Sequence, residues 1–439
     1  MKVSVPFFRR KRYLTGIDWT ILTLDRMSYR ATGGSNASQI VLELQGKFDD
    51  HRFRAAMTEF VRLFPVLAGK STRDWNLAPY WKMPRAGNAV PLRVDSRRIT
   101  RQELLPALGE SVNTRFSGSR EHLAFRVFHV LDDCHYLAMR FDHRLFDAQG
   151  AESFLDLFQR WYSGEDCRSR LAAIALTEPA HLDEWKKKFE AGKQLVRMLL
   201  PLAKTPLMVL PRPSPLKGRA FKFSLMEFDA SETKAVTERA YDEAGFLMFM
   251  PYVLAGAIQA LDETFKARAG GGQDYLVSVS VDLRTPNKVA SLLFFNHLSF
   301  LIFRIPAVDA GDRRKVLEAI RSQMYEQIKS GFPRALSEAS MLMRIVPPTL
   351  LSRLLLKPMR GEMASLGFSC VGKGGYGLPQ FMETTVNNLF HMPLLPIPPG
   401  LGFVVNQFGK RMNAVLAYLD GMLSDDEVSR IQENVRRLL

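Results

Sequence analysis

Hydrophobic and polar residues alternate through residues 135–141, and this two-residue period is that of a β-strand with one buried face. From about residue 151 the period changes to steps of three and four residues, which is typical of a helix with one apolar side. The apolar positions are Leu137, Met139 and Phe141 in the strand and Phe154, Leu157, Phe158 and Trp161 in the helix. We therefore expect a strand, a short connector and a helix in this stretch.

The same two periods recur along the rest of the chain. Strands are expected at residues 38–44, 121–131, 220–228, 275–283 and 295–303, with a hairpin at 401–407 and 411–418. Helices are expected at residues 48–63, 231–244, 250–267, 312–329 and 424–439, with Asp49 or Asp50 as one cap and Ser424 with Glu427 as a capping box. A strand followed by a helix near the start of each half favours an α/β fold of two similarly built lobes.

The connector after the first strand carries the candidate chemistry. Its sequence is DHRLFDAQG, residues 142–150, with His143 and Asp147 four residues apart and with Gly150 free to allow a close approach or an unusual backbone angle. Such a pair also occurs as a solvated or capping arrangement in surface turns. Here it follows a buried strand and precedes an aromatic helix face, so we expect His143 at a partly enclosed site, where an imidazole is suited to remove a proton at neutral pH.

Charge and cysteine usage limit the function classes. The 439 residues include 60 Lys and Arg against 45 Asp and Glu, a net charge of +15, which favours anionic partners such as phosphorylated cofactors, acidic carrier proteins or anionic lipid. No zinc-finger, RNA-binding or helix-turn-helix pattern is present, so we expect no nucleic-acid partner. The three cysteines have no metal-binding or CxxC spacing, so no metal is expected. Without a signal-peptide pattern or a run of about 20 apolar residues, a cytoplasmic location is expected.

A change of character at residues 183–219 predicts a domain boundary. This stretch is basic, rich in Leu and Met, and interrupted by five prolines. We predict an N-terminal lobe at 1–190, a linker at 191–218 and a C-terminal lobe at 219–439. The linker either packs its leucines on both lobes or lies on a membrane surface, since basic and apolar stretches bind anionic interfaces. Residues 341–360 have the same character, so peripheral contact with the inner membrane surface stays open.

Residues 136–155 resemble the HHxxxDG region of the acyltransferases that depend on CoA or a carrier protein. That superfamily includes chloramphenicol acetyltransferase, peptide-synthetase condensation domains, alcohol acetyltransferases and the wax ester synthase/diacylglycerol acyltransferases. The resemblance implies that His143 is the general base and that Asp147 organises the loop. Asp142 stands where many members have the first His, and Ala148 stands where most have a Gly after the Asp.

Three further stretches share the resemblance. The sequence VDLRTPN, residues 281–287, resembles a motif whose Arg pairs with the Asp of HxxxD, which implies an ion pair between Arg284 and Asp147; the alternative partner is Asp282. Residues 295–303 resemble a Gly-Asn-x-x-Ser strand through Asn296 and Ser299. Residues 383–392 resemble a segment near the active-site channel, which implies Asn388 as a donor to a substrate carbonyl or oxyanion, or else as a bridge between backbone groups.

The resemblance implies two α/β lobes of the chloramphenicol acetyltransferase type, with mixed sheets and an active-site tunnel between them. The implied reaction moves an acyl group from a thioester to a small hydroxyl or amine acceptor, with acyl-CoA or acyl carrier protein as co-substrate and no bound cofactor. The alternative is a non-catalytic protein of the same fold that binds acyl groups, a carrier protein or lipid.

Overall fold

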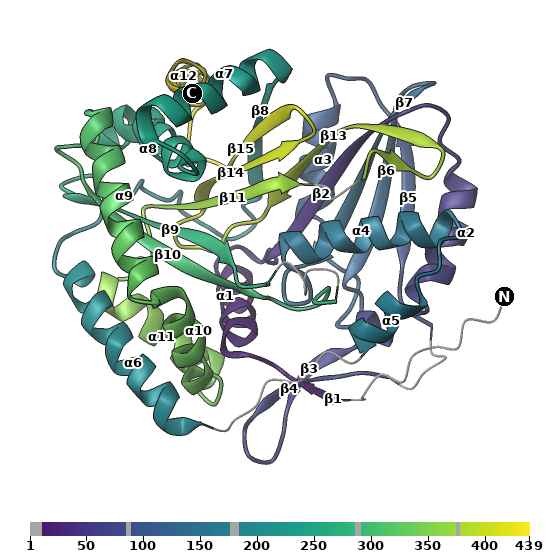
Figure 1. The fold of residues 1–439 in the computed structure, drawn as a ribbon, viewed down its shortest axis with the longest axis horizontal. Coiled ribbons are helices and arrows are strands. Elements are labelled where there is room, and N and C mark those ends of the chain that lie inside the picture. The colour runs from purple at the N-terminus through teal and green to yellow at the C-terminus, as the bar shows by residue number, and fades with distance from the viewer. Residues whose placement is uncertain (1–10, 85–88, 176–183, 286–290, 375–377) are drawn as a thin grey trace.

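Two six-stranded sheets with helices on their faces stand side by side in the computed structural model (Figure 1). The structure describes residues 11–84, 89–175, 184–285, 291–374 and 378–439. The N-terminal half, purple to blue, forms most of the lobe on the right, and the C-terminal half, teal to yellow, forms the lobe on the left.

The sheet of the N-terminal lobe has the strand order β12-β13-β2-β7-β6-β5. Only the pair β5–β6 is parallel among these strands. The predicted hairpin of β6 and β7 is confirmed. Helices α2 and α4 cover one face of this sheet and α3 covers the other. The bounds are β2 (Ala37–Gln45), β5 (Arg93–Arg98), β6 (Leu123–Leu131), β7 (Cys134–Asp142), β12 (Gln380–Phe381), β13 (Thr384–Pro393), α2 (Asp50–Val61), α3 (Leu104–Asn113) and α4 (Ala148–Tyr162).

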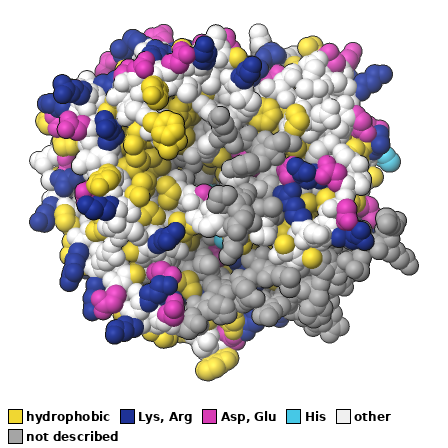
Figure 2. Space-filling view, in the orientation of Figure 1, with side chains coloured by type: hydrophobic (Ala, Val, Ile, Leu, Met, Phe, Trp, Pro, Cys, Tyr) yellow, Lys and Arg dark blue, Asp and Glu magenta, His cyan; other side chains and the backbone are white. Residues whose placement is uncertain are grey.

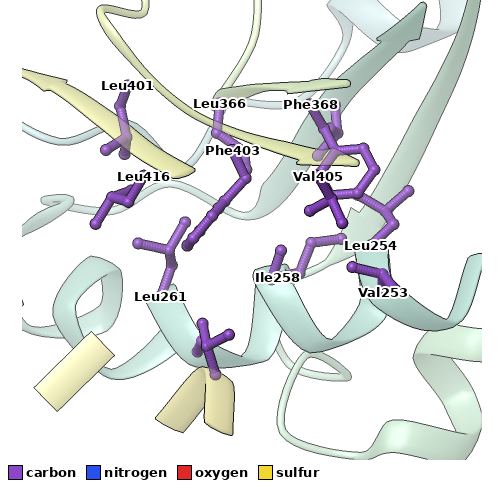
Figure 3. Packing of buried hydrophobic residues seen from close by; sticks show 14 of the residues in the cluster. Val253, Leu254, Ile258, Leu261, Leu366, Phe368, Leu401, Phe403, Val405 and Leu416 are labelled. Atoms are coloured by element: carbon purple, nitrogen blue, oxygen red, sulfur yellow. The ribbon is translucent and has the colours of Figure 1, made fainter. Parts of the chain in front are cut away.

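The sheet of the C-terminal lobe has the order β10-β9-β11-β14-β15-β8. It is mixed, because β11 is parallel to both β9 and β14 while the other pairs are antiparallel. Figure 3 shows Val253, Leu254, Ile258 and Leu261 of α8 packed against side chains of β11, β14 and β15. The bounds are β8 (Phe221–Phe228), β9 (Asp274–Asp282), β10 (Leu298–Pro306), β11 (Leu366–Gly374), β14 (Leu401–Phe408), β15 (Arg411–Leu419), α7 (Ala230–Ala244), α8 (Phe249–Arg268), α9 (Arg313–Lys329) and α12 (Asp425–Leu438).

Within the described ranges, no single helix is both long enough and apolar enough to cross a membrane. Helices α7 and α8 reach that length and composition only together, and they meet at a bend of 97°.

The C-terminal half also contributes to the N-terminal sheet. Strand β13 pairs antiparallel with β2, and β12 pairs with β13, so residues 380–393 extend the sheet of the other lobe. Figure 1 shows the yellow-green β13 beside the purple β2. The predicted C-terminal lobe at 219–439 is therefore not self-contained, since alternation along a strand identifies its faces but not its partner strand.

The predicted linker at 191–218 is partly helical. Helix α6 (Trp185–Leu199) runs across the predicted boundary at residue 190 and packs on α10 (Phe332–Met343). The helix ends in a short 3-10 turn, η2 (Leu200–Ala203), whose second residue is a proline. Met208 and Leu210 are then buried in the core of the C-terminal lobe, so this segment packs on one lobe.

The remaining elements lie at the lower edge and between the lobes in Figure 1. Strands β1, β4 and β3 form a small sheet in that order, and α1 contacts both α10 and α11. The bounds are β1 (Lys11–Tyr13), β3 (Lys70–Arg73), β4 (Pro79–Lys82), α1 (Gly16–Thr32), α5 (Arg168–Ala175), α11 (Pro348–Leu356), η1 (Pro65–Ala68) and η4 (Lys357–Met359).

Capping residues define several helix starts as predicted. Asp49 accepts a hydrogen bond from the backbone N–H of Arg52 at the start of α2. Ser424 and Glu427 form the expected reciprocal capping box at the start of α12. Each cap satisfies backbone N–H groups that have no partner inside the helix.

Candidate active site

The connector between β7 and α4 is fixed by contacts with the opposite lobe. Leu145 and Phe146 are fully buried. Phe146 forms an isolated parallel bridge with Phe295, and the N–H of Phe295 donates to the carbonyl of Leu145 at 2.5 Å. The connector that carries His143 is therefore held against the segment just before β10.

Asp147 joins the two lobes. Its Oδ1 accepts from the N–H of Gly150 and from Nη2 of Arg284, both at 2.8 Å, and its Oδ2 accepts from the N–H of His297 at 2.9 Å. The side chains of Arg284 and Asp147 are only 1% and 5% exposed. The predicted ion pair is confirmed, and the alternative partner Asp282 also binds Arg284, at 3.1 Å.

The electrostatic surroundings keep Asp147 ionised. Burial acts to raise the pKa of Asp147, but the charge and hydrogen bond of Arg284, together with the contact to His297, outweigh it and lower that pKa below its ordinary value. A carboxylate with a fixed charge can hold the Arg284 guanidinium permanently in place.

His143 is half-buried at the start of the connector. Its carbonyl accepts from Nδ2 of Asn296 at 2.9 Å, and the N–H of Asn296 donates to Oδ1 of Asp18 at 3.0 Å. The imidazole Nδ1 is buried without a hydrogen-bond partner among the described residues. Asn296 therefore positions the backbone of His143, and its predicted contact with a substrate stays a prediction.

Asp142, the residue before His143, belongs to a buried ionic cluster. Its carboxylate contacts Nη2 of Arg144 at 2.5 Å and Nδ1 of His122 at 2.7 Å. Burial acts to raise the pKa of Asp142, but the charge of Arg144 and the hydrogen bonds lower it far below its ordinary value. Asp142 is thus a supporting residue, as predicted, while its partners Arg144 and His122 were missed.

Gly150 and Ala148 suit the start of α4. A Cβ at Gly150 would lie 2.2 Å from the carbonyl oxygen of Leu293, so a side chain there would collide with the opposite lobe. The glycine serves the close approach that the sequence suggested. Ala148 is the first residue of α4 and has no positive φ, so alanine fits this position, where the motif that the sequence resembles has glycine.

Asn388 and Ser299 lie in structural hydrogen bonds. The two donors of Asn388 Nδ2 go to Oε1 of Glu227 at 2.9 Å and Oδ1 of Asn413 at 3.0 Å, which leaves this amide no N–H for a substrate. Its Oδ1 accepts from the N–H of Leu389, where the register of β13 shifts against β2. Ser299 donates to the carbonyl of Pro333 at 2.6 Å and ties β10 to α10. The donors of both side chains are thus used within the fold, as is usual for buried polar atoms, and the predicted contacts of these residues with a substrate stay predictions.

Arg12 is another buried cation near the connector that the sequence did not predict. The guanidinium of Arg12 lies 3.6 Å from the ring centroid of Phe295 and 3.6 Å from Oδ2 of Asp18. Its Nε and Nη1 are buried and make no hydrogen bond within the described chain. Arg12 lies in a basic N-terminal stretch, where the sequence pattern gives no sign of burial.

Hydrophobic side chains gather in the upper left part of the surface in Figure 2, on the side of the C-terminal lobe. The chain turns a sharp corner between α7 and α8 in that lobe. Phe246 and Leu247 are highly exposed at that corner. The tunnel expected between the lobes stays a prediction. Across the described ranges, no group of three or more His, Cys, Asp or Glu side chains is placed to hold a metal ion.

Solved structures with the same arrangement exist, although no family model and no curated protein matches the chain. The TRI3 trichothecene 15-O-acetyltransferase from Fusarium sporotrichioides has a TM-score of 0.74 at 14% identity, over 99% of this chain and 97% of that chain. The first condensation domain of the calcium-dependent antibiotic synthetase has a TM-score of 0.68 at 14% identity, over 98% and 95%. The epimerization domain from the third module of tyrocidine synthetase B has 0.62 at 11%, over 99% and 98%.

This chain has the condensation-domain fold. The predicted fold class, two α/β lobes with mixed sheets, is confirmed along nearly the full chain. At 11–14% identity these likenesses establish the fold alone, so the reaction must be argued from the residues on the connector.

Proposed function

We propose that the protein transfers an acyl group from a thioester, either acyl-CoA or an acyl carrier protein, to a hydroxyl or amine acceptor. The observation that carries this proposal is the ion pair between Asp147 and Arg284 of the other lobe. This pair fixes the connector on which His143 lies half-buried. The condensation-domain fold and the likeness to an O-acetyltransferase support the same reaction class.

In this mechanism His143 acts as the general base. Its imidazole takes the proton as the acceptor oxygen or nitrogen attacks the carbonyl carbon of the thioester. When the tetrahedral intermediate collapses, the C–S bond breaks and the thiolate takes the proton back from the imidazolium. The products are the acylated acceptor and the free thiol, and no acyl-enzyme forms.

The cysteines give little support to a covalent route. Burial raises the pKa of the Cys370 thiol to about 12, and burial also raises the pKa of Cys134 and Cys167. A thiol that stays protonated is a weak nucleophile at neutral pH. Direct transfer with His143 as base therefore fits these side chains better. The net charge of +15 would attract the phosphates of CoA or an acidic carrier protein in the cytoplasm.

The test is release of free thiol from a panel of acyl-CoAs and acyl-pantetheine thioesters, with hydroxyl and amine acceptors. We expect turnover by the wild type and a loss of roughly 10²- to 10⁴-fold in His143→Ala, since general-base catalysis contributes about that much. His51→Ala is the matched control, because His51 is exposed on α2 and outside the connector.

Equal rates in His143→Ala and the wild type would overturn the role of His143. Absence of turnover by the wild type with every thioester would overturn the enzymatic proposal. If the wild type nevertheless binds the thioesters tightly, the non-catalytic binder becomes the better description. Circular dichroism of the variants separates these outcomes from loss of folding.

A further inference from the structure

Exposed hydrophobic side chains follow one side of helix α6. Trp185, Phe189 and Val196 fall within an arc of about 40° on a helix with 3.6 residues per turn, and Leu200 continues the line into η2. Their side chains are 44%, 56%, 55% and 62% exposed, respectively. The adjoining face of α6 packs on α10, so this apolar ridge has no described covering element.

Two neighbouring segments carry the same kind of side chain. The hairpin of β3 and β4, which projects at the lower edge of Figure 1, holds Trp75 and Leu77, 91% and 55% exposed. A hydrophobic side chain marks the same lower edge in Figure 2. On the turn into α11 and on α11 itself, Ile345, Leu350 and Leu354 are 42–52% exposed.

Two contacts link these three segments. Arg73 of the hairpin donates from Nη1 to the carbonyl of Ile345 and from Nη2 to that of Val346. At the other end, η2 after α6 contacts η4 after α11. The ridge, the hairpin tip and α11 therefore form one surface, which we call the apolar rim. It includes Trp75 and Trp185, which are 91% and 44% exposed.

Positive charge borders the apolar rim. Residues 191–204 and 339–361 contain no Asp or Glu. The exposed side chains of Arg197, Arg353 and Lys357 form no ion pair with another described residue. Lys193 pairs with Glu190, and Lys187 pairs with Glu184 and Glu338, so the negative charge near α6 lies toward its first turns.

We propose that the apolar rim docks the protein on the surface of an anionic lipid bilayer. An amphipathic helix with a tryptophan, large apolar residues and flanking cations lies in the interface between lipid headgroups and acyl chains. Tryptophan is favoured at that level of a membrane, and each cation near an anionic leaflet adds attraction. A nucleic acid would leave the apolar ridge unburied. This proposal is independent of acyl transfer.

The test uses vesicles of phosphatidylcholine alone and vesicles with about 30% phosphatidylglycerol, an anionic surface of the kind cations recognise. We expect the wild type to sediment with the anionic vesicles, to bind neutral ones much less, and to be released by roughly 0.5 M NaCl. Fluorescence of Trp75 and Trp185 should shift to shorter wavelength on binding. The variant Trp75→Ser/Trp185→Ser/Phe189→Ser should bind at least about tenfold more weakly, since it loses three interfacial anchors.

Matched controls replace equally exposed apolar residues elsewhere. Val308→Ser and Leu131→Ser, at side chains 88% and 59% exposed, should bind anionic vesicles as the wild type does. Equal binding to both kinds of vesicle, undiminished binding by the triple variant, or no binding by the wild type would overturn the proposal. Light scattering tests the alternative that a second copy of the chain covers the apolar rim. If the wild type forms a dimer, the triple variant does not, and neither binds vesicles, the rim is a dimer interface.

Discussion

Each lobe contains a hairpin that leads through a connector into a helix, and the two units share a design. In the N-terminal lobe β6 and β7 are followed by residues 143–147 and α4; in the C-terminal lobe β14 and β15 are followed by residues 420–424 and α12. Each connector has five residues and ends in a side chain that caps the helix. The two residues before each cap are buried and apolar: Leu145 and Phe146 in one unit, Met422 and Leu423 in the other.

The units differ in what holds the cap. Ser424 is satisfied locally by Glu427, and Glu427 is held by Arg268 of the same lobe through a pair whose side chains are 31% and 13% exposed. Asp147 is held by Arg284 of the opposite lobe, in a pair that is almost fully buried. The C-terminal unit is therefore stabilised by contacts within its own lobe. The N-terminal unit has the same local design, but the geometry of its connector depends on both lobes.

The largest expected effect comes from removing the charge of Asp147. Asparagine at 147 keeps an acceptor for the N–H of Gly150, so Asp147→Asn removes the ion pair and retains the cap. Arg284 would remain buried without its main partner, and we expect a loss of about 3–5 kcal/mol in the free energy of unfolding, measured with urea. Thiol release should fall with it, because the connector loses its anchor.

The matched change in the other lobe is Glu427→Gln. Its pair with Arg268 is partly exposed, so we expect a loss of about 1 kcal/mol or less, with unchanged thiol release. Similar losses in the two variants would contradict the contrast between a buried link and a local one.

Gly150→Ala tests how closely the lobes approach at α4. The added Cβ would meet the carbonyl oxygen of Leu293 at 2.2 Å, and forcing the backbone apart should cost about 1–3 kcal/mol despite the better helix propensity of alanine. Gly311→Ala is the control, because a Cβ at Gly311 meets nothing within 4 Å. A stable Gly150→Ala protein with full activity would show that the contact with Leu293 is not needed.

The stability that the carboxylates of the N-terminal connector contribute should depend on pH in the acid range. The pKa of Asp147 and that of Asp142 are lowered in the folded protein, so both carboxylates stabilise it above their ordinary unfolded pKa of 3.8. This contribution is lost as the pH falls through the depressed folded values, that is, below about 4. Asp147→Asn should therefore unfold with a shallower pH dependence below about 4 than the wild type, as measured by the thermal midpoint at each pH. An unchanged slope would show that Asp147 does not contribute.

Sequence reasoning succeeded where the determining interaction is local. Alternation gave the β6–β7 hairpin, and the pattern Ser424 to Glu427 gave the start of α12. The pair of Asp147 and Arg284 spans the chain, yet it was predictable because each residue lies in a recognisable motif. Periodicity alone would not have joined them.

The failures concern partners that no local pattern specifies. Nothing in residues 384–393 identifies β2 as the neighbour, so Asn388 could not be placed against Asn413 and Glu227. Counting back from the turn of the β6–β7 hairpin sets Asp142 opposite Leu123. A bulge between His129 and Leu131 shifts the register by one, and His122 becomes the partner instead.

A similarly small effect is expected of Ser424→Ala. The variant removes one side of the capping box, and an N-cap serine contributes about 1 kcal/mol to stability. The backbone N–H of Ser424 can still donate to Glu427, and Arg268 still holds Glu427, so the start of α12 should stay in place. We expect a small drop in the urea midpoint and no change in thiol release. A marked loss of activity with little loss of stability would show that the C-terminal unit also positions His143, and the distinction between scaffold and functional connector would fail.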